Sequence, residues 1–369
     1  MKKFFIQLSS LLVIFFIINF FLSIILEPIN KFIRIKILNK PVYNEESLRA
    51  IGIDRKEEGI FYDETWNRTF RYVQFAEHYE SETYDQIYVN VTKNDGRKVI
   101  NKKNCSKNFY FYGSSLTFGY NVKDEQTIPS YFKDILNTNY SKSNYCVYNF
   151  GSASYFSTQE NILFQTHILD NRINENDFIF FINGRSENGN KNSRVSADLE
   201  SLFNGLNARM LDEIKFSFLF FWDSLPTTKL YYNLKKIFIK VNLPIENNSK
   251  SLINEISKKE IKDVFQKNIL IREAICNNLK FNCFTFLQPF PNIHVFYDKK
   301  VKQKNIINKL DLERYDLLKN TKYIFDISNS LVNNTSPALV DPDHYSPKSN
   351  KLIANSIYDI VKERIEKNF

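Results

Sequence analysis

The sequence predicts an α/β protein in which a mostly parallel sheet is covered by helices. From about residue 104 onward, short apolar runs of strand type alternate with longer segments of helical type, which is the pattern of an α/β sheet. A hydrophobic content of 43%, with 15% aromatic residues, favours a large packed core over a disordered chain. Several apolar runs end in glycine or polar turns. Ligands of open α/β sheets bind at that end of the strands.

Five strands and three helices are expected in this region. The strands are predicted at residues 108–113, 146–150, 177–182, 283–287 and 322–326. The helices are predicted at about 127–136, 158–169 and 348–365. Pro129 falls in the first turn of the first of these helices, where proline is tolerated.

The amino-terminal segment predicts a membrane anchor. Residues 4–26 are nearly all Phe, Ile, Leu and Val, and a helix that crosses a bilayer needs about 20 apolar residues. Lysines precede this run and no small-x-small cleavage site follows it, so we expect an uncleaved, single-pass signal anchor with its flank over residues 1–40. A cleaved secretion signal is the alternative. Positive charge flanks the run on both sides, so charge alone does not decide the orientation. The remaining chain is expected to be extracytoplasmic, in a periplasm or at the cell surface.

The rest of the chain divides into two predicted parts. Residues 41–103 are polar, with strand-like alternation at 69–75 and 86–91, and predict a small accessory region. Residues 104–369 form the main domain, interrupted by an insertion at about 190–254 that contains apolar runs. This insertion is either a substrate lid or membrane-facing surface, or an extra pair of packed helices.

The formal net charge of +9 does not indicate a nucleic-acid partner. Lysines are spread along the chain, without a concentrated basic helix face, a zinc-finger spacing or an aromatic RNA-binding box. A diffuse basic surface is therefore expected, and attraction to an anionic membrane or acidic polymer stays open.

The four cysteines argue against a metal site, because none forms a CxxC pair and no histidine stands at ligand spacing beside them. Cys105 lies just before one predicted strand and Cys146 opens another, and a disulfide can join them if the strands are parallel neighbours. Cys276 and Cys283 can close a short helix-to-strand loop. Two such disulfides would indicate an oxidising compartment. Four reduced, buried thiols are the alternative.

Ser115 is the candidate nucleophile. It follows a predicted strand in the turn Gly113-Ser114-Ser115 and precedes a helix, which exposes its hydroxyl at the sheet edge and turns its own N–H toward a negative charge. A Gly-Ser-Ser turn is weak by itself, because glycine and serine fill ordinary loops.

Asp341 and His344 are its candidate partners. They stand three residues apart in the last polar loop, so the carboxylate can hold the imidazole Nδ1–H while Nε2 faces the nucleophile. Together with Ser115 they form the Ser-His-Asp set that acyl-ester hydrolysis needs, and this chemistry requires no metal or cofactor. The alternative is that His344 only caps the final helix.

The segments FYGSSLTFG, NFGSASY, FLQP and DPDHYSPKSNKLIA together resemble the SGNH/GDSL hydrolases in order and approximate spacing, over about residues 109–367. The resemblance implies a flavodoxin-like three-layer α/β/α sandwich. It also implies that Ser115 is the nucleophile, that Asp341 and His344 complete the triad, and that Gly151 supplies an oxyanion N–H.

One departure from the family affects the oxyanion hole. The family's Gly-x-Asn-Asp block reads Gly184-Arg185-Ser186-Glu187 here, so Ser186 stands where an asparagine donor is expected. Asn183 or Asn188 can substitute for it. Losing one such donor in other enzymes costs on the order of 10²–10³ in rate.

Three functions follow from these observations. The first is a serine esterase that acts on a carbohydrate or lipid acyl ester, such as an O-acetyl group of an envelope glycan. The second is an acyltransferase that uses the same triad to acylate an envelope polysaccharide. The third is a catalytically silent envelope protein that keeps the fold, which the Ser186 departure favours.

Overall fold

The computed structural model describes residues 2–36, 43–73, 75–80, 83–102, 105–141, 143–187, 222, 225–228, 230–231, 255–290, 309–332, 334, 337–341 and 343–367. The chain divides into two compact units. One contains Met1–Pro41 and Asp198–Leu252, and the other contains Val42–Ala197 and Ile253–Phe369. The predicted insertion at 190–254 falls mostly outside the described residues, and so does Asn188.

The first unit contains the helix α1 (Lys2–Lys36). Within this unit, the backbone N–H and the hydroxyl of Thr227 donate to Asn19 Oδ1 over 3.2 and 2.9 Å. Among the residues that the structure describes, no helix is both long and apolar enough to cross a membrane, so the predicted transmembrane segment at 4–26 is not supported.

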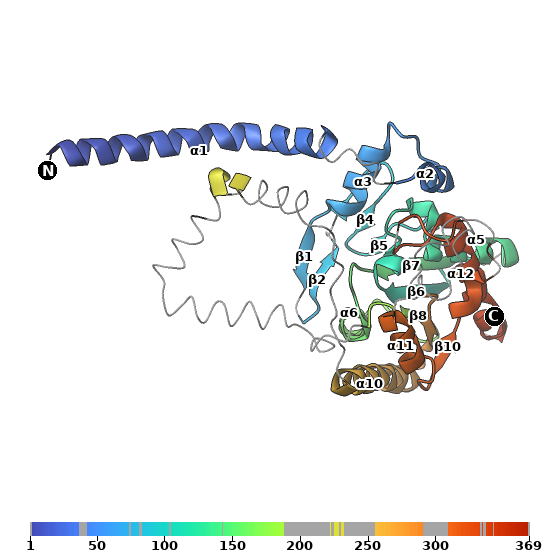
Figure 1. Ribbon diagram of the computed structural model, residues 1–369. Helices are drawn as coiled ribbons and strands as arrows, with labels where there is room; N and C mark the ends of the chain where they lie inside the picture. The colour runs from blue at the N-terminus through green and yellow to red at the C-terminus, as the bar shows by residue number, and fades with distance from the viewer. Residues whose placement is uncertain are drawn as a thin grey trace. The chain divides into compact units, whose positions relative to one another are not determined.

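The second unit is a three-layer α/β structure around an eight-stranded sheet (Figure 1). The strand order is β10-β9-β8-β6-β7-β5-β4-β3. The five strands that the sequence predicts are all present and run parallel: β6 (Lys107–Gly113), β7 (Tyr145–Gly151), β8 (Phe178–Asn183), β9 (Asn282–Leu287) and β10 (Ile324–Asp326). Numbered along the chain, they follow the order 2-1-3-4-5 of flavodoxin-like sheets, which places the switch point next to β6.

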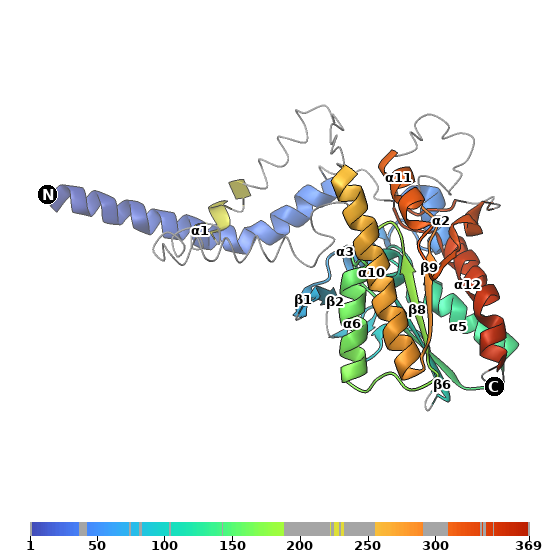
Figure 2. The same cartoon turned by 90° about the horizontal axis from the view of Figure 1, so that it is seen from below.

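Helices cover both faces of this sheet. Figure 2 shows α6 (Ser157–Leu169) and α10 (Glu255–Leu279) on one face, and α5 (Ile128–Asn139) and α12 (Pro347–Lys367) on the other. Helix α5 begins where the sequence predicts, because the Thr127 hydroxyl accepts the Ser130 N–H and Pro129 fits the first turn. A shorter helix, α11 (Lys309–Leu318), precedes β10.

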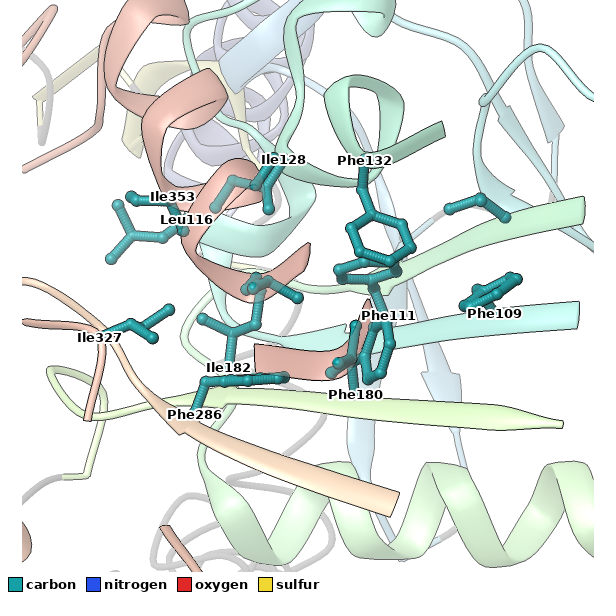
Figure 3. Close-up of a cluster of buried hydrophobic side chains, with 14 of the residues drawn as sticks. Phe109, Phe111, Leu116, Ile128, Phe132, Phe180, Ile182, Phe286, Ile327 and Ile353 are labelled. Atoms are coloured by element: carbon teal, nitrogen blue, oxygen red, sulfur yellow. The ribbon is translucent and has the colours of Figure 1, made fainter. Parts of the chain in front are cut away.

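Side chains that alternate along β6 divide between two aromatic cores. Phe109 and Phe111 pack with Phe132 of α5 and Phe180 of β8, as Figure 3 shows. Tyr110 and Tyr112 belong to the core on the other face. A strand buried on both faces needs this nearly continuous apolar sequence, and it is the reason that the strand could be recognised.

Residues 43–97 contain α2 (Glu45–Ile51), α3 (Glu58–Trp66), a hairpin of β1 (Phe70–Val73) with β2 (Glu77–Glu80), and three short strands. These strands, β3 (Thr83–Tyr84), β4 (Val91–Thr92) and β5 (Gly96–Arg97), extend the main sheet beyond β7. The segment predicted as accessory thus lies in the same compact unit as the rest of the sheet.

The strand predicted at residues 86–91 is wrong except at its last residue. The carboxylate of Glu64 accepts the backbone N–H groups of Ile87, Tyr88 and Val89 at 3.3, 2.7 and 3.2 Å. A buried side chain from α3 therefore satisfies the donors that a neighbouring strand would otherwise have paired.

Both predicted disulfides are present. Cys105 pairs with Cys146 across a Cα–Cα distance of 5.5 Å, and Cys276 pairs with Cys283 across 6.1 Å. The alternative of four reduced thiols is therefore wrong for this structure.

Candidate active site

Ser115 lies at the start of α4 (Ser115–Phe118), directly after the central strand β6. The turn is tight because Gly113 has no side chain: a Cβ at Gly113 would lie 2.1 Å from Thr117 Oγ1 and 2.9 Å from Ile182 O. Ser114 precedes the helix in an extended conformation and caps it. The fold thus holds the Ser115 hydroxyl at the carboxyl edge of the sheet, where it is partly exposed.

Asp341 and His344 lie in the loop before α12. Asp341 Oδ1 accepts the backbone N–H groups of Asp343 and His344 at 2.7 and 2.6 Å, which closes the loop into a turn. Asp341 Oδ2 lies 2.8 Å from His344 Nδ1. Because a carboxylate only accepts hydrogen bonds, Nδ1 carries the hydrogen and Nε2 is left as an acceptor.

The structure brings the three predicted residues together. His344 Nε2 lies 3.1 Å from Ser115 Oγ, within hydrogen-bonding reach. Burial alone would raise the pKa of the Asp341 carboxyl, but its hydrogen bond to His344 and the charge of that ring outweigh burial and lower the pKa. Asp341 is therefore ionised at neutral pH, which is the state that can orient and stabilise an imidazolium.

Two aromatic rings hold the His344 ring in place. Tyr120 stacks on it at a centroid distance of 5.5 Å and an angle of 23°, and Trp66 meets it edge to face at 5.5 Å and 74°. Tyr120 is buried, whereas Trp66 is 40% exposed. His344 itself is only 7% exposed, so its ring has little freedom to turn.

Gly151, the predicted oxyanion donor, is engaged elsewhere. Its N–H donates to Asn149 Oδ1 over 3.1 Å. A Cβ at Gly151 would lie 2.2 Å from the backbone nitrogen of Phe118, so the glycine allows α4 to approach β7. Its position is explained by packing, and nothing in its hydrogen bonding supports a catalytic role.

Asn183, another predicted donor, also points into the protein. Its amide nitrogen donates to both carboxylate oxygens of Glu160 at 2.8 and 2.7 Å, and its oxygen accepts from Arg272 Nη1 at 2.7 Å. Ser186 lies half-buried in the turn after β8. The expected oxyanion role of Asn183 is thus not supported by its contacts, and that of Ser186 stays a prediction.

Beneath the turn after β8 lies a buried charged cluster that the sequence did not predict. Arg272 pairs with Glu160 at 2.8 Å, and both side chains are 1% exposed. Glu187 accepts the N–H and the hydroxyl of Ser157 at 2.7 and 3.0 Å. Burial, and then the negative charge of Glu160, raise the pKa of Glu187 to about 7.

A second polar group that the sequence did not predict contacts the triad directly. Asn121, in the loop after α4, donates to Asp341 Oδ2, and its own oxygen accepts from Tyr43 and Trp66. No motif marks these residues, because the contacts join positions 55 to 220 residues apart. The sequence offers one weak hint, which is an asparagine in a short loop. Asparagine tolerates a left-handed backbone conformation better than most residues do.

In the part of the chain that the structure describes, no group of three or more His, Cys, Asp or Glu side chains is placed to hold a metal ion.

No known protein family matches the chain, and no curated protein matches it. Solved structures do show similarity. An alpha/beta hydrolase enzyme from the metagenome of Lake Arreo, Spain, matches with a TM-score of 0.38 and 10% identity, over 69% of this chain and 94% of that one. An acetylxylan esterase from Geobacillus stearothermophilus matches with 0.35 and 12%, over 69% and 94%. A psychrotrophic esterase from Pseudoalteromonas sp. matches with 0.35 and 10%, over 71% and 100%. Similarity this low does not transfer the activities of these proteins to this chain.

Proposed function

We propose that this protein is a serine ester hydrolase of the SGNH/GDSL type, with Ser115, His344 and Asp341 as its triad. The observation that carries the proposal is the continuous hydrogen-bonded series from Ser115 Oγ through both ring nitrogens of His344 to Asp341 Oδ2, at 3.1 and 2.8 Å. Such a series activates a serine that is a weak nucleophile at its ordinary pKa.

The proposed reaction gives each residue of the triad a role. Ser115 Oγ attacks the ester carbonyl carbon as His344 Nε2 takes the hydroxyl proton. Asp341 stabilises the imidazolium that forms, and His344 then gives the proton to the departing alcohol. The acyl group stays on Ser115 until a water, deprotonated by His344 Nε2, attacks the acyl carbon. The bond to Ser115 Oγ then breaks, His344 returns the proton to Oγ, and the acid is released.

Among the described residues, the proposed oxyanion donors are the Ser115 N–H and the Ser186 hydroxyl, and Asn188 stays a predicted donor outside them. The first N–H groups of a helix have no partner within the helix, and Ser115 is the first residue of α4. A hydroxyl in place of an asparagine amide reaches less far, so we expect a slower enzyme than one with a full set of donors. The same shortage of donors favours the alternative function, a catalytically silent protein that keeps the fold.

We further propose a carbohydrate acyl ester as the substrate class. Trp66 exposes part of its ring next to His344, and a rigid, partly exposed tryptophan beside a catalytic histidine suits the apolar face of a sugar. A sugar hydroxyl that replaces water in the second step would make the protein an acyltransferase. Product analysis with and without an acceptor sugar separates these two reactions.

We also propose that the protein works outside the cytoplasm. All four of its cysteines are paired in disulfides, which persist in oxidising compartments and are rare in the cytosol. Thiol alkylation of protein taken directly from cells tests this proposal. Free thiols at these four positions would contradict it.

The decisive test of the enzymatic proposal is labelling by a fluorophosphonate, paired with hydrolysis of p-nitrophenyl acetate. We expect Ser115→Ala to abolish both. A matched control is Ser106→Ala, because Ser106 stands just before β6, at the other end of the strand that leads to Ser115. Folded wild-type protein that neither labels nor hydrolyses the ester would favour the silent alternative.

A further inference from the structure

We propose that Asn121 is a positioning residue that orients Asp341 through its side-chain amide and ties the triad to Tyr43 and Trp66. The inference rests on the proposed function for its kinetic consequences. Its structural content, that the Asn121 amide holds the Asp341 carboxylate, can be tested without any activity.

The contacts determine which way the Asn121 amide points. Trp66 Nε1 can only donate, and it lies 2.7 Å from Asn121 Oδ1, so the atom at that position must be the oxygen. The hydroxyl of Tyr43 lies 2.5 Å from the same oxygen. The NH₂ group is therefore the end that faces Asp341 Oδ2.

Tyr43 is a donor at any working pH. Its side chain is 1% exposed, and burial raises its pKa far above the usual range, so the hydroxyl stays protonated. A flip of the Asn121 amide would set its NH₂ against the Trp66 N–H, which can only donate, and would break the hydrogen bond that Tyr43 donates to Oδ1. The orientation that serves Asp341 is thus enforced from the opposite side.

The carboxylate of Asp341 is held at both oxygens. Oδ1 accepts two backbone N–H groups of its own loop, and Oδ2 accepts His344 Nδ1–H and the Asn121 amide. Of these donors, only Asn121 comes from the segment that carries Ser115. The amide also lies 3.5 Å from His344 Nδ1, so it fixes the carboxylate at the atom that meets the imidazole.

The loop that carries Asn121 is itself anchored. Asn121 is fully buried and has a left-handed backbone, with φ of 61°. The buried guanidinium of Arg97 donates to the carbonyl oxygens of Phe118, Gly119 and Val122, which surround it in sequence. A side chain with such fixed surroundings can restrain a catalytic carboxylate rather than follow it.

Two substitutions separate positioning from mere support. Asn121→Gly removes the amide and accepts the positive φ without strain. Asn121→Asp is nearly isosteric and can still accept from Tyr43 and Trp66, but it places a carboxyl against Asp341. Asn176, with φ of 69° and an exposed side chain at the amino end of the sheet, provides matched controls as Asn176→Gly and Asn176→Asp.

We expect Asn121→Gly to lower kcat on the order of 10- to 100-fold with little change in KM, as for loss of one hydrogen bond to a charged group. In Asn121→Asp, a neutral carboxyl can still donate to Asp341, whereas an ionised one repels it. Its kcat should therefore fall by about tenfold with rising pH across a range where the wild type is constant. A purely structural asparagine would leave the shape of the pH profile unchanged, and that result would overturn the proposal.

A second measurement needs no substrate. The His344 Nδ1–H proton should give a downfield proton NMR signal that disappears in His344→Gln. In Asn121→Gly, we expect this proton to exchange with water about tenfold faster or more, while both Asn176 variants leave it unchanged. Unaltered exchange and chemical shift would refute the role of Asn121 whether or not the protein is an esterase. If exchange is faster in Asn121→Gly but a fluorophosphonate does not label Ser115 of the wild type, the positioning role of Asn121 is supported and the proposed hydrolase function is rejected.

Discussion

His344 Nε2 lies 3.1 Å from Ser115 Oγ, although the two residues are 229 positions apart in the chain. The contact exists because β6 delivers Ser115 to the carboxyl edge of the sheet, and the loop before α12 returns to the same edge. Asp341 sits behind the imidazole at 2.8 Å. The reactivity of the site depends on this alignment, and the following experiments probe it and the fold around it.

Asp341→Asn should nearly abolish esterase activity without unfolding the protein. An asparagine can present its NH₂ to His344 Nδ1 and so favours the tautomer that cannot accept the Ser115 proton. We expect kcat to fall on the order of 10⁴-fold, as in other serine triads. Asp343→Asn is the control, because Asp343 is half-exposed and forms a surface ion pair with Arg185, and we expect its kcat within about threefold of the wild type. Activity of Asp341→Asn within tenfold of the wild type would contradict the assigned role.

Glu187 should make stability depend on pH. Its pKa is raised from 4.5 to about 7 in the folded state, so the folded protein holds this proton more tightly than the unfolded chain does. Below about pH 4.5 the proton on Glu187 adds about 3 kcal/mol to the free energy of unfolding. This contribution is lost as the pH rises to about 7 and above.

Glu187→Gln should remove this loss. The free energy of unfolding of the variant, minus that of the wild type, should be larger at pH 8 than at pH 5. Urea denaturation at both pH values measures this difference. Glu175→Gln, at an exposed surface position, serves as the control. A stability difference between Glu187→Gln and the wild type that is the same at both pH values would show that Glu187 is not protonated in this range.

Gly151→Ala should destabilise the protein through packing. The new Cβ would lie 2.2 Å from the backbone nitrogen of Phe118, and backbone atoms cannot rotate away, so we expect a loss of about 1–3 kcal/mol or more. Activity should fall as well, because α4 carries Ser115. Gly59→Ala is a matched control: nothing lies within 4 Å of its added Cβ, and in a helix it should be stabilising by about 0.5–1 kcal/mol. Equal effects of the two substitutions would rule out this explanation.

The two disulfides should differ in their contribution to stability. Cys105 and Cys146 are 41 residues apart, and Cys276 and Cys283 are 7 apart, so the first bridge restricts the unfolded chain more. Replacing the first pair by serine should lower the free energy of unfolding by about 4 kcal/mol, and replacing the second by about 2 kcal/mol. Denaturant titration of the two double variants checks the order, and the reverse order would contradict the loop-entropy account.

Much of the fold could be predicted from short stretches of sequence. Strands such as β6 and β8 are buried on both faces, so their apolar runs stand out without knowledge of their neighbours. The strand expected at 86–91 failed because Glu64, from a separate helix, takes the backbone donors that a strand would use. No local pattern contains that contact.

The candidate site shows the same contrast between local features, which the sequence reveals, and contacts between distant segments, which it does not. The turn with Ser115 and the loop with Asp341 and His344 could be recognised from the amino-acid sequence, because a tight turn and a three-residue spacing are local properties of the chain. The polar groups that contact these residues follow from the folded structure alone. Folding brought Asn121 to Asp341, 220 positions away, and turned Asn183 toward Glu160 and Arg272. Hydrogen bonds between distant segments depend on how the layers pack, and packing is settled by the whole chain at once.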